Sequence, residues 1–357
     1  MKQKLIFTNL VGEAIDGLIA ELGNPQVAVV ADTNTAALVL PILVNDSKAV
    51  ADATVITIPA GDGSKSIEGL SELWQKLSDM EASRSTVVVN LGGGMIGDLG
   101  GFAAATYKRG LRCINVPTTL LAAVDASVGG KTAINFNGLK NQIGTFTEPV
   151  AAIISTIYFN TLSDQEILSG YAEMIKHALL EDDATLGKVL AFNPVSPLKN
   201  TVGLMPLLEA SVDVKRRIVE EDLTEKGIRK ALNFGHTIGH AFESFAAAAK
   251  SPIPHGYAVA WGMVAELVLS QMKKGFPSAT LHSVAAYVRD NYGAFPITCD
   301  DYPALIASMR QDKKNASAEQ INFTLLESTG HPVIDCTATP EEIGAALDIY
   351  RDLLGLA

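Results

Sequence analysis

The chain has 357 residues, of which 48% are hydrophobic and 19% are charged, so its composition excludes a disordered chain and predicts a compact globular protein. This length exceeds what one hydrophobic core usually supports, which predicts two domains. Asp and Glu outnumber Lys and Arg by 39 to 28. The resulting net charge of −11 disfavours a nucleic-acid partner, because such a partner requires a basic face.

Cysteines and apolar stretches bear on the cellular compartment. Cys113, Cys299 and Cys336 are widely spaced and form no CxxC pair, as expected in a reducing cytosol and not for a disulfide framework or a thiolate zinc site. No secretory signal is recognisable, and the longest apolar stretches contain Asp98 or Glu266. The sequence therefore predicts a soluble, cytoplasmic protein without a membrane partner.

Short runs rich in β-branched residues alternate with helix-like segments in the first part of the chain. Buried strands are predicted at residues 27–31, 53–58, 86–90, 113–116 and 151–154, and residues 66–80 have the apolar spacing of a helix. This alternation is typical of parallel βαβ units with right-handed crossovers.

Strand-like runs nearly vanish after about residue 158. Helices are predicted at residues 162–180, 205–221, 230–250, 257–274 and 278–292, with one late strand at residues 321–326. We therefore predict an α/β protein, with a Rossmann-like parallel-sheet domain at residues 1–158 followed by a mainly α-helical domain at residues 159–357.

The predicted strand at residues 86–90 leads into a glycine-rich motif. Gly92, Gly94 and Gly97 have the G-x-G-x-x-G spacing of a dinucleotide-binding turn, in which glycines let the backbone approach a pyrophosphate at a helix N-terminus. A tight turn with close strand–helix packing explains the same glycines equally well. No acidic residue follows about 20 positions downstream to bind a ribose hydroxyl, and Asp32 is the substitute.

Five polar residues recur at helical spacing in the second half: Arg229, Asn233, His236, His240 and Glu243. Their spacing predicts one polar stripe on a helix with apolar flanks, so the stripe needs internal partners. A solvated polar face is the weaker alternative.

Histidines in this region suggest a metal site. His236 and His240 could both be metal ligands, or one could be a ligand and the other an acid–base group. Glu173 and His255 are candidates to complete a site of two histidines and one carboxylate, in which a metal polarises an oxygen. The histidines at positions 177 and 282 compete for the same assignment.

Cations point to the kind of substrate. The segment from Asp125 to Thr132 ends in Gly-Gly-Lys-Thr, but it has aspartate where a P-loop requires its first glycine, so ATP binding is disfavoured. Five cations have apolar or glycine-rich neighbours in the sequence, unlike typical surface lysines: Lys131, Lys140, Lys176, Lys215 and Arg229. Such cations in an acidic protein indicate a small anionic substrate that carries a carboxylate or a phosphate.

Together these motifs resemble the 3-dehydroquinate synthase family over most of the chain, from Asp32 to Lys314. They occur in the family's order, at residues 92–98, 107–110, 117–121, 128–132, 138–141, 172–176, 232–240 and 255–256. The resemblance implies an NAD-dependent and zinc- or cobalt-dependent lyase and cyclase of the shikimate pathway, which leads to the aromatic amino acids. Its substrate would be 3-deoxy-D-arabino-heptulosonate 7-phosphate, and its products 3-dehydroquinate and phosphate.

The resemblance also implies roles for individual residues. It places the metal on Glu173, His236 and His255, with His240 near the substrate phosphate. The substrate would contact Asp125, Lys131, Asn141, Lys176, Lys215, Arg229 and Asn233, with Arg109 reaching the phosphate from the partner subunit of a homodimer. NAD would contact Asp32, Asn34, Asp62, Lys65, Gly93, Gly94, Asp98, Thr118, Thr119, Lys131, Lys140 and Thr161, and Lys313 or Lys314 would close over the phosphate.

In this family's chemistry, NAD oxidises one ring hydroxyl, the acidified neighbouring C–H allows phosphate to leave, and the hydride returns before ring closure.

The chain departs from the usual family pattern at Asp62, Ala126 and Ser155, none of which is an expected metal ligand. One alternative is another sugar-phosphate cyclase, such as a 2-deoxy-scyllo-inosose synthase, whose substrate lacks the carboxylate that Arg229 and Asn233 would bind. A metal-dependent alcohol dehydrogenase and a non-catalytic NAD-binding protein are further alternatives.

Overall fold

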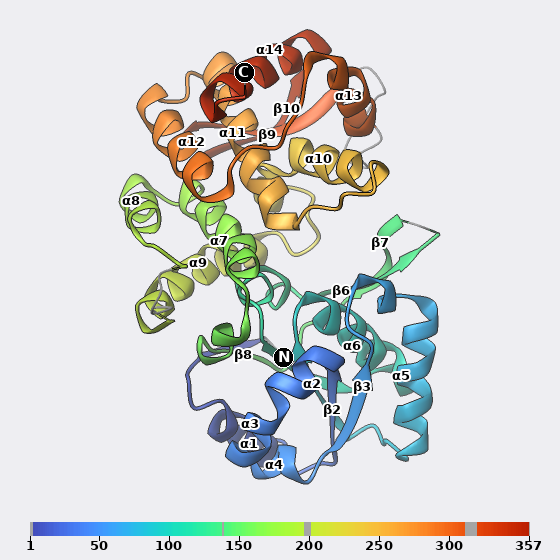
Figure 1. The fold of residues 1–357 in the computed structure, drawn as a ribbon. Helices are drawn as coiled ribbons and strands as arrows, with labels where there is room; N and C mark the ends of the chain where they lie inside the picture. The colour runs from blue at the N-terminus through green and yellow to red at the C-terminus, as the bar shows by residue number, and fades with distance from the viewer. Residues whose placement is uncertain (1–2, 138, 196–200, 311–319, 357) are drawn as a thin grey trace. The chain divides into compact units, whose positions relative to one another are not determined.

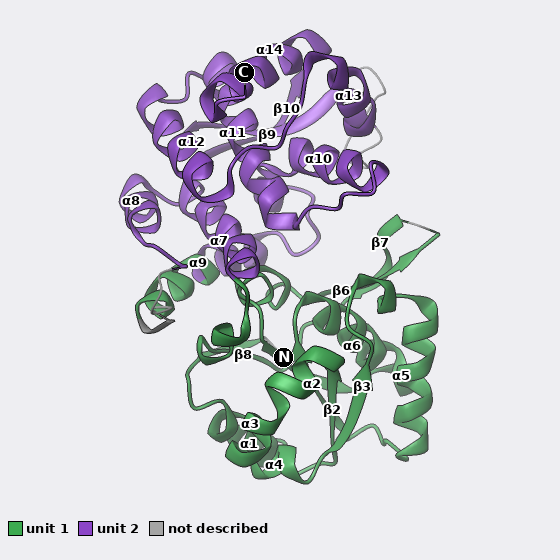
Figure 2. Cartoon of the chain, in the orientation of Figure 1, with its two compact units in different colours: residues 1–163, 199–212 green, residues 164–198, 213–357 purple. Residues whose placement is uncertain are grey.

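The computed structural model describes residues 3–137, 139–195, 201–310 and 320–356. The chain divides into two compact units, shown in Figure 2: unit 1 contains residues 1–163 and 199–212, and unit 2 contains residues 164–198 and 213–357. The division into functional domains at residues 1–158 and 159–357 stays a prediction. No helix in the described part of the chain is long and apolar enough to cross a membrane.

A six-stranded parallel sheet forms the centre of unit 1, which confirms the predicted α/β fold class (Figure 1). Its strands are β1 (Lys4–Phe7), β2 (Val27–Asp32), β3 (Thr54–Ile58), β4 (Val87–Gly92), β5 (Arg112–Pro117) and β8 (Ala151–Ile154), in the order β1-β8-β5-β4-β2-β3. The helices of the unit are α1 (Val11–Glu21), α2 (Thr33–Leu38), α3 (Leu40–Asp46), α4 (Lys48–Ala51), α5 (Ile67–Asp79) and α6 (Gly94–Thr106).

Successive side chains of β2 and β4 enter two different cores, one on either face of the sheet. Val29 on β2 packs with residues of α1, α3 and α4, whereas its neighbour Val30 packs with residues of α5 and α6. Because both faces of the inner strands β2, β4, β5 and β8 are covered, these strands are apolar at most positions, which explains their runs of β-branched residues.

The order of the strands creates a switch point between β2 and β4. From β2 the chain adds β3 on one side, and it then returns to add β4 and β5 on the other side. The carboxyl ends of β2 and β4 are therefore neighbours from which the connections leave in opposite directions. In open α/β sheets this is where ligands bind.

Two further strands of unit 1, β6 (Lys131–Phe136) and β7 (Leu139–Phe146), form an antiparallel hairpin that was not predicted. Nearly all of β7 is exposed, so the alternation of buried and exposed residues that identifies a strand is missing.

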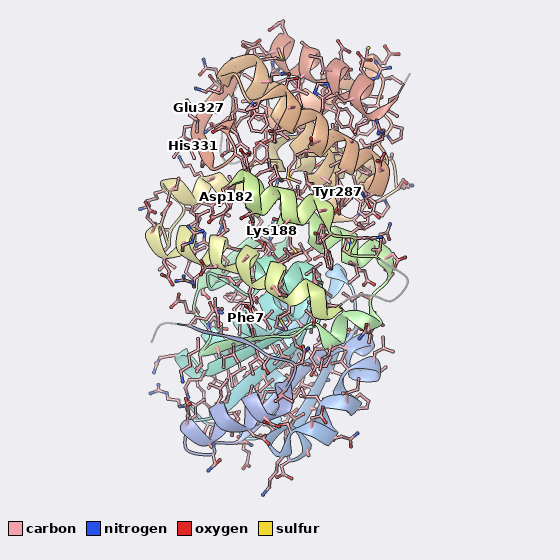
Figure 3. All side chains as sticks on the ribbon, turned by 90° about the vertical axis from the view of Figure 1, so that its left-hand side faces the viewer. Phe7, Asp182, Lys188, Tyr287, Glu327 and His331 are labelled. Atoms are coloured by element: carbon pink, nitrogen blue, oxygen red, sulfur yellow. The ribbon has the colours of Figure 1, made fainter. Side chains whose placement is uncertain are left out.

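Unit 2 is mainly helical. Its helices are α7 (Asp164–Leu179), α8 (Asp183–Ala191), α10 (His236–Ala248), α11 (His255–Lys274), α12 (Ser278–Tyr292), α13 (Tyr302–Arg310) and α14 (Pro340–Leu354), and α9 (Thr201–Glu221) runs from unit 1 into unit 2. The prediction of a single late strand is wrong, because β9 (Ile321–Ser328) pairs with β10 (His331–Ala338). The turn between them lies near Glu327 and His331 in Figure 3. A bulge at Asp335, whose φ is 57°, interrupts β10 and obscures its pattern.

Helices α10 and α11 pack unusually closely because glycines face each other. A Cβ atom on Gly262 of α11 would lie 2.1 Å from the Gly235 carbonyl oxygen, and a Cβ on Gly239 of α10 would lie 2.9 Å from the Ala258 carbonyl oxygen. Since real Cβ atoms do not approach backbone this closely, any side chain at these positions forces the two helices apart.

We expect Gly262→Ala to lower the free energy of unfolding by about 1–3 kcal/mol, because its methyl group overpacks the α10–α11 contact. Gly187→Ala in α8 is the matched control, since a Cβ there meets no atom within 4 Å. Figure 3 labels Asp182, the N-cap of α8, and Lys188 within the helix. The control should gain up to about 1 kcal/mol from helix propensity. Urea unfolding measures both, and wild-type stability of Gly262→Ala would contradict the packing argument.

Candidate active site

Glu173 lies in the middle of α7, where every residue from Ile167 to Leu179 is buried. Its side chain has no exposed surface, and Lys176, one turn along the same helix and also buried, forms an ion pair with it. An unpaired buried carboxylate is costly, so the positive partner is needed to keep Glu173 ionised.

His236 is the first residue of α10, and Gly235 before it adopts a left-handed φ of 79°. This conformation separates α10 from the preceding 3-10 helix, Ile228–Asn233. The prediction of one helical stripe through residues 229–243 is therefore wrong. Arg229 and Asn233 lie in the 3-10 helix, whereas His236, His240 and Glu243 lie in α10. The left-handed glycine interrupts the helix between the two groups.

A buried carboxylate from α11 holds the start of α10. Glu266 accepts hydrogen bonds from the backbone N–H groups of Gly235, at 2.6 Å, and Ile238, at 3.0 Å, and it has no exposed surface. It thereby satisfies N–H groups at the start of α10 that have no partner within the helix, and it places negative charge at the positive end of the helix dipole. Glu266 therefore fixes the backbone that carries His236.

His255 is the first residue of α11, and the glycine after it sets its position. A Cβ atom on Gly256 would lie 1.8 Å from the carbonyl oxygen of Ser169 in α7, and the Gly256 N–H donates to the Ser169 hydroxyl at 3.1 Å. This close approach places His255 beside the helix that carries Glu173.

The three side chains converge on one point. Nε2 of His236 lies 3.5 Å and Nε2 of His255 lies 3.6 Å from Oε1 of Glu173, and ligand atoms of the three lie within 4.8 Å of one another. Nδ1 of His236 lies 3.1 Å from the Phe234 carbonyl oxygen, and Nδ1 of His255 lies 3.1 Å from Oε2 of Glu243. With each Nδ1–H donated to these acceptors, Nε2 is the nitrogen that each imidazole presents to a metal, and binding of the metal displaces any proton on it.

The electrostatics of the cluster follow from burial and from the charges nearby. Burial raises the pKa of Glu173, but the Lys176 ammonium and the two imidazoles outweigh it and hold the pKa well below its usual value. Burial, followed by the Lys176 charge, lowers the pKa of His236 well below its usual value. Burial lowers the pKa of His255, but the nearby Glu173 and Glu243 carboxylates outweigh it and raise the pKa to about 10.

This donor set fits a divalent metal. Among the described residues, neither oxygen of Glu173 accepts a hydrogen bond of ordinary geometry, although both are fully buried. One carboxylate and two imidazoles match the three protein ligands of a catalytic zinc site, and the fourth position remains for water or substrate. The structure thus brings together Glu173, His236 and His255, the residues predicted to bind the metal.

His240 lies outside this cluster, one turn further along α10. It is exposed, with Nε2 4.0 Å from Oε2 of Glu243, and it forms a second group of possible ligands with Glu243 and His255. Of the two competing histidines, His177 is buried in α7, whereas His282 is exposed in α12 and bonded to Ser278.

The other predicted substrate residues of unit 2 are mostly buried. Lys176, Lys215 and Arg229 are all less than one-tenth exposed, as expected for cations that are not ordinary surface residues. A guanidinium N–H of Arg229 donates to the Leu223 carbonyl oxygen at 2.6 Å, and the side-chain amide of Asn233 donates to Glu225 at 2.9 Å. The 3-10 helix and the loop before it are therefore held together by the residues predicted to bind the carboxylate.

Most residues predicted to bind NAD lie at the carboxyl ends of neighbouring strands in unit 1. Asp32 ends β2 and Asn34 follows in α2, Gly93 and Gly94 join β4 to α6, Asp98 is in α6, and Thr118 and Thr119 follow β5. These positions surround the switch point between β2 and β4. The Asp32 carboxylate also caps α2, since it accepts the N–H groups of Asn34 and Thr35.

Lys65 is buried and connects three elements of the same unit. Its ammonium lies 2.5 Å from both the Asp98 carboxylate and the Asn141 side-chain oxygen. Asp62, in the same turn after β3, accepts a hydrogen bond from Asn135 at 3.0 Å. These contacts tie the hairpin of β6 and β7 to the end of the sheet where NAD is predicted to bind.

Several predicted residues of unit 1 are exposed: Arg109, Lys131, Lys140, Asn141 and Thr161. The prediction that Lys131 and Lys140 differ from surface lysines is wrong, because both side chains are exposed, one at the start of β6 and one on β7. Asp125 is half-buried in a π-helical turn, Ala122–Ala126, a rare geometry often found at functional sites. Gly138, Lys313 and Lys314 lie outside the described residues.

Two residues next to the metal cluster had no predicted role. Glu243 belongs to the polar stripe, and its spacing of seven from His236 places it two helical turns away on the same face. Glu266 was recognised only as a charge that interrupts an apolar stretch. A single carboxylate in an otherwise apolar helix was the available signal, because such a group needs a buried partner.

Comparison with known proteins gives the family of the chain. Residues 55–169 match the family model for the 3-dehydroquinate synthase N-terminal region, and residues 170–315 match the model for the 3-dehydroquinate synthase C-terminal region. A 3-dehydroquinate synthase of Parabacteroides distasonis is 46% identical over 355 residues, which cover 99% of both chains. One of Listeria innocua is 40% identical over 289 residues, which cover 80% of this chain and 78% of that one.

A solved structure supports the fold. A 2-deoxy-scyllo-inosose synthase complexed with carbaglucose-6-phosphate, NAD+ and Co2+ matches with a TM-score of 0.82 at 23% identity, covering 96% of this chain and 95% of that one. The chain thus has the fold of that synthase. The chain belongs to the 3-dehydroquinate synthase family. The inosose synthase alternative is not favoured, because at this low identity the likeness shows the fold alone.

We expect Glu173→Ala, His236→Ala and His255→Ala each to abolish tight binding of one zinc or cobalt ion, since each removes one of three protein ligands. Metal analysis of the purified variants by plasma emission measures this, with circular dichroism as the control for folding. Full metal occupancy in all three variants would show that the ion binds elsewhere.

Proposed function

We propose that the protein converts 3-deoxy-D-arabino-heptulosonate 7-phosphate into 3-dehydroquinate and phosphate. One observation carries this proposal: a chain related over its whole length to 3-dehydroquinate synthases places Glu173, His236 and His255 around a single point. A non-catalytic NAD-binding protein needs no such metal cluster. An alcohol dehydrogenase is disfavoured because both halves of the chain match 3-dehydroquinate synthase models.

NAD and a divalent ion are the cofactors of this proposal. When bound, NAD accepts and returns one hydride, and the metal polarises the oxygen at the reacting carbon. Glu173, His236 and His255 hold the ion, and Lys176 keeps Glu173 ionised for that task. The residues at the carboxyl ends of β2, β4 and β5 bind NAD, with the N-terminus of α6 available to its pyrophosphate.

The substrate's two anionic groups have separate partners in this proposal. Arg229, Asn233 and Lys215 bind the carboxylate, and Lys131, Asn141 and His240 bind the phosphate, while Asp125 and Lys176 contact the substrate between them. Fixing both ends orients the substrate for elimination and keeps the product of elimination in place for ring closure.

The assembly and location of the protein are part of the proposal. We infer a homodimer in the cytoplasm, in which Arg109 binds the substrate phosphate of the partner subunit. Arg109 supports this because its side chain is exposed and therefore accessible to another subunit. Lys140 and Thr161 complete the NAD contacts in this assignment.

The function is tested by phosphate release from the heptulosonate phosphate. We expect release to need NAD in catalytic amounts only, to stop when a chelator removes the metal, and to resume when zinc or cobalt is added. Because the hydride returns within one turnover, no NADH accumulates. Steady growth of the NADH absorbance in proportion to product would instead identify a dehydrogenase.

A second test concerns the carboxylate. Arg229→Leu should lower kcat/KM by about a hundredfold or more, because removing one partner of a buried charge pair costs about 2–5 kcal/mol. Metal content and affinity for NAD should stay at wild-type values. Since Arg229 also holds the Leu223 carbonyl, the melting temperature is measured in parallel. A lower melting temperature with unchanged kcat/KM would show a structural role alone.

A further inference from the structure

The two histidines of the metal cluster are held in different ways. Nδ1 of His236 is bound to a backbone carbonyl of its own segment, which no side-chain substitution removes. Nδ1 of His255 is bound to the side chain of Glu243, which comes from another helix. The orientation of His255 therefore depends on one replaceable carboxylate.

Burial makes this dependence stronger. Glu243 is mostly buried, with 17% of its side chain exposed, whereas His255 keeps 32% of its side chain exposed at the first position of α11. A terminal, partly exposed imidazole can rotate or change tautomer unless an acceptor holds one nitrogen. Glu243 is such an acceptor, and its charge strengthens the hydrogen bond.

We propose that Glu243 is a positioning residue of the metal site, which orients His255 and keeps the Nε2 lone pair directed at the ion. The proposal rests on the proposed function only in taking the cluster of Glu173, His236 and His255 to be a metal site. In this role Glu243 is not itself a ligand of the ion. It acts through His255, and it makes the imidazole a stronger ligand because a carboxylate acceptor increases the basicity of Nε2.

The arrangement of the two helices supports this role. Helix α10 carries the ligand His236 and the carboxylate Glu243, and α11 carries the ligand His255 and the carboxylate Glu266. Glu243 binds the ligand of α11, and Glu266 caps α10 at the residue before its ligand. Each helix thus holds the metal ligand of the other.

An alternative role for Glu243, as a ligand of a second metal ion, predicts a different number of bound ions. With His240 and His255 it forms a second group that could hold an ion of its own. In that group His255 would have to bind through Nδ1, the nitrogen that now faces Glu243. The two uses differ in the number of ions bound, and in the response to substitution of His240.

The experiment measures the affinity of the metal-stripped full-length chain for zinc, by competition with a chromophoric chelator. The variants are Glu243→Gln, which keeps an acceptor but loses the charge, and Glu243→Ala, which loses both. His240→Ala tests the second group. Glu327→Gln is the matched control, because it makes the same chemical change at an exposed position on β9, shown in Figure 3.

We expect a single bound ion and a loss of zinc affinity of about tenfold in Glu243→Gln and up to about a hundredfold in Glu243→Ala. His240→Ala and Glu327→Gln should bind zinc as the wild type does. The visible spectrum of bound cobalt should change in both Glu243 variants, while the melting temperature of the metal-stripped Glu243→Gln protein stays that of the wild type. A merely structural role would shift the melting temperature and leave the spectrum unchanged.

Wild-type zinc affinity in both Glu243 variants would overturn the proposal. So would a second ion that Glu243→Gln and His240→Ala both lose while the first is retained. A wild-type chain that binds neither zinc nor cobalt would overturn it as well. Because zinc affinity is measured without substrate, a metal-loaded protein that releases no phosphate would contradict the proposed function alone.

Discussion

The architecture of unit 2 depends on the burial of one negative charge. Glu173 has no exposed surface, and a carboxylate in that position is stable only when positive or electron-pair-accepting partners surround it. Lys176 supplies a fixed charge from the same helix, and His236 and His255 approach from two other helices. A divalent ion satisfies the same carboxylate more completely, so the constraint that shapes the helical packing also creates the site.

The glycines of this region follow from that constraint. Three helices can bring ligands to one point only if their backbones approach closely, and Gly256, Gly239 and Gly262 permit this where any side chain would collide with backbone. At Gly239 the neighbour that approaches is the adjacent helix α11, and Gly235 forms the left-handed turn before α10.

Patterns of burial explain which strands and which site residues could be predicted from the sequence. Strands of the central sheet are apolar on both faces, so β2, β4, β5 and β8 were predicted within one or two residues, whereas the exposed β7 and the bulged β10 carry no such pattern. Family motifs identified the metal cluster, which the structure then brought together. Spacing alone was misleading for Arg229 and Asn233, because helical periodicity in a sequence cannot reveal that a glycine with positive φ interrupts the helix. A single carboxylate in an apolar helix signals that Glu266 has a buried partner, but its role was missed because backbone N–H partners cannot be identified from a sequence.

The reciprocal arrangement of α10 and α11 bears on how this site can change over evolutionary time. Residues that share contacts do not contribute independently, so the effect of replacing one depends on the identity of the others. A side chain larger than glycine at position 262 displaces the Gly235 carbonyl, and with it the turn that Glu266 caps and the histidine that follows. We therefore expect a substitution on one of these helices to be tolerated only together with a compensating change on the other. The two helices should then vary as one unit.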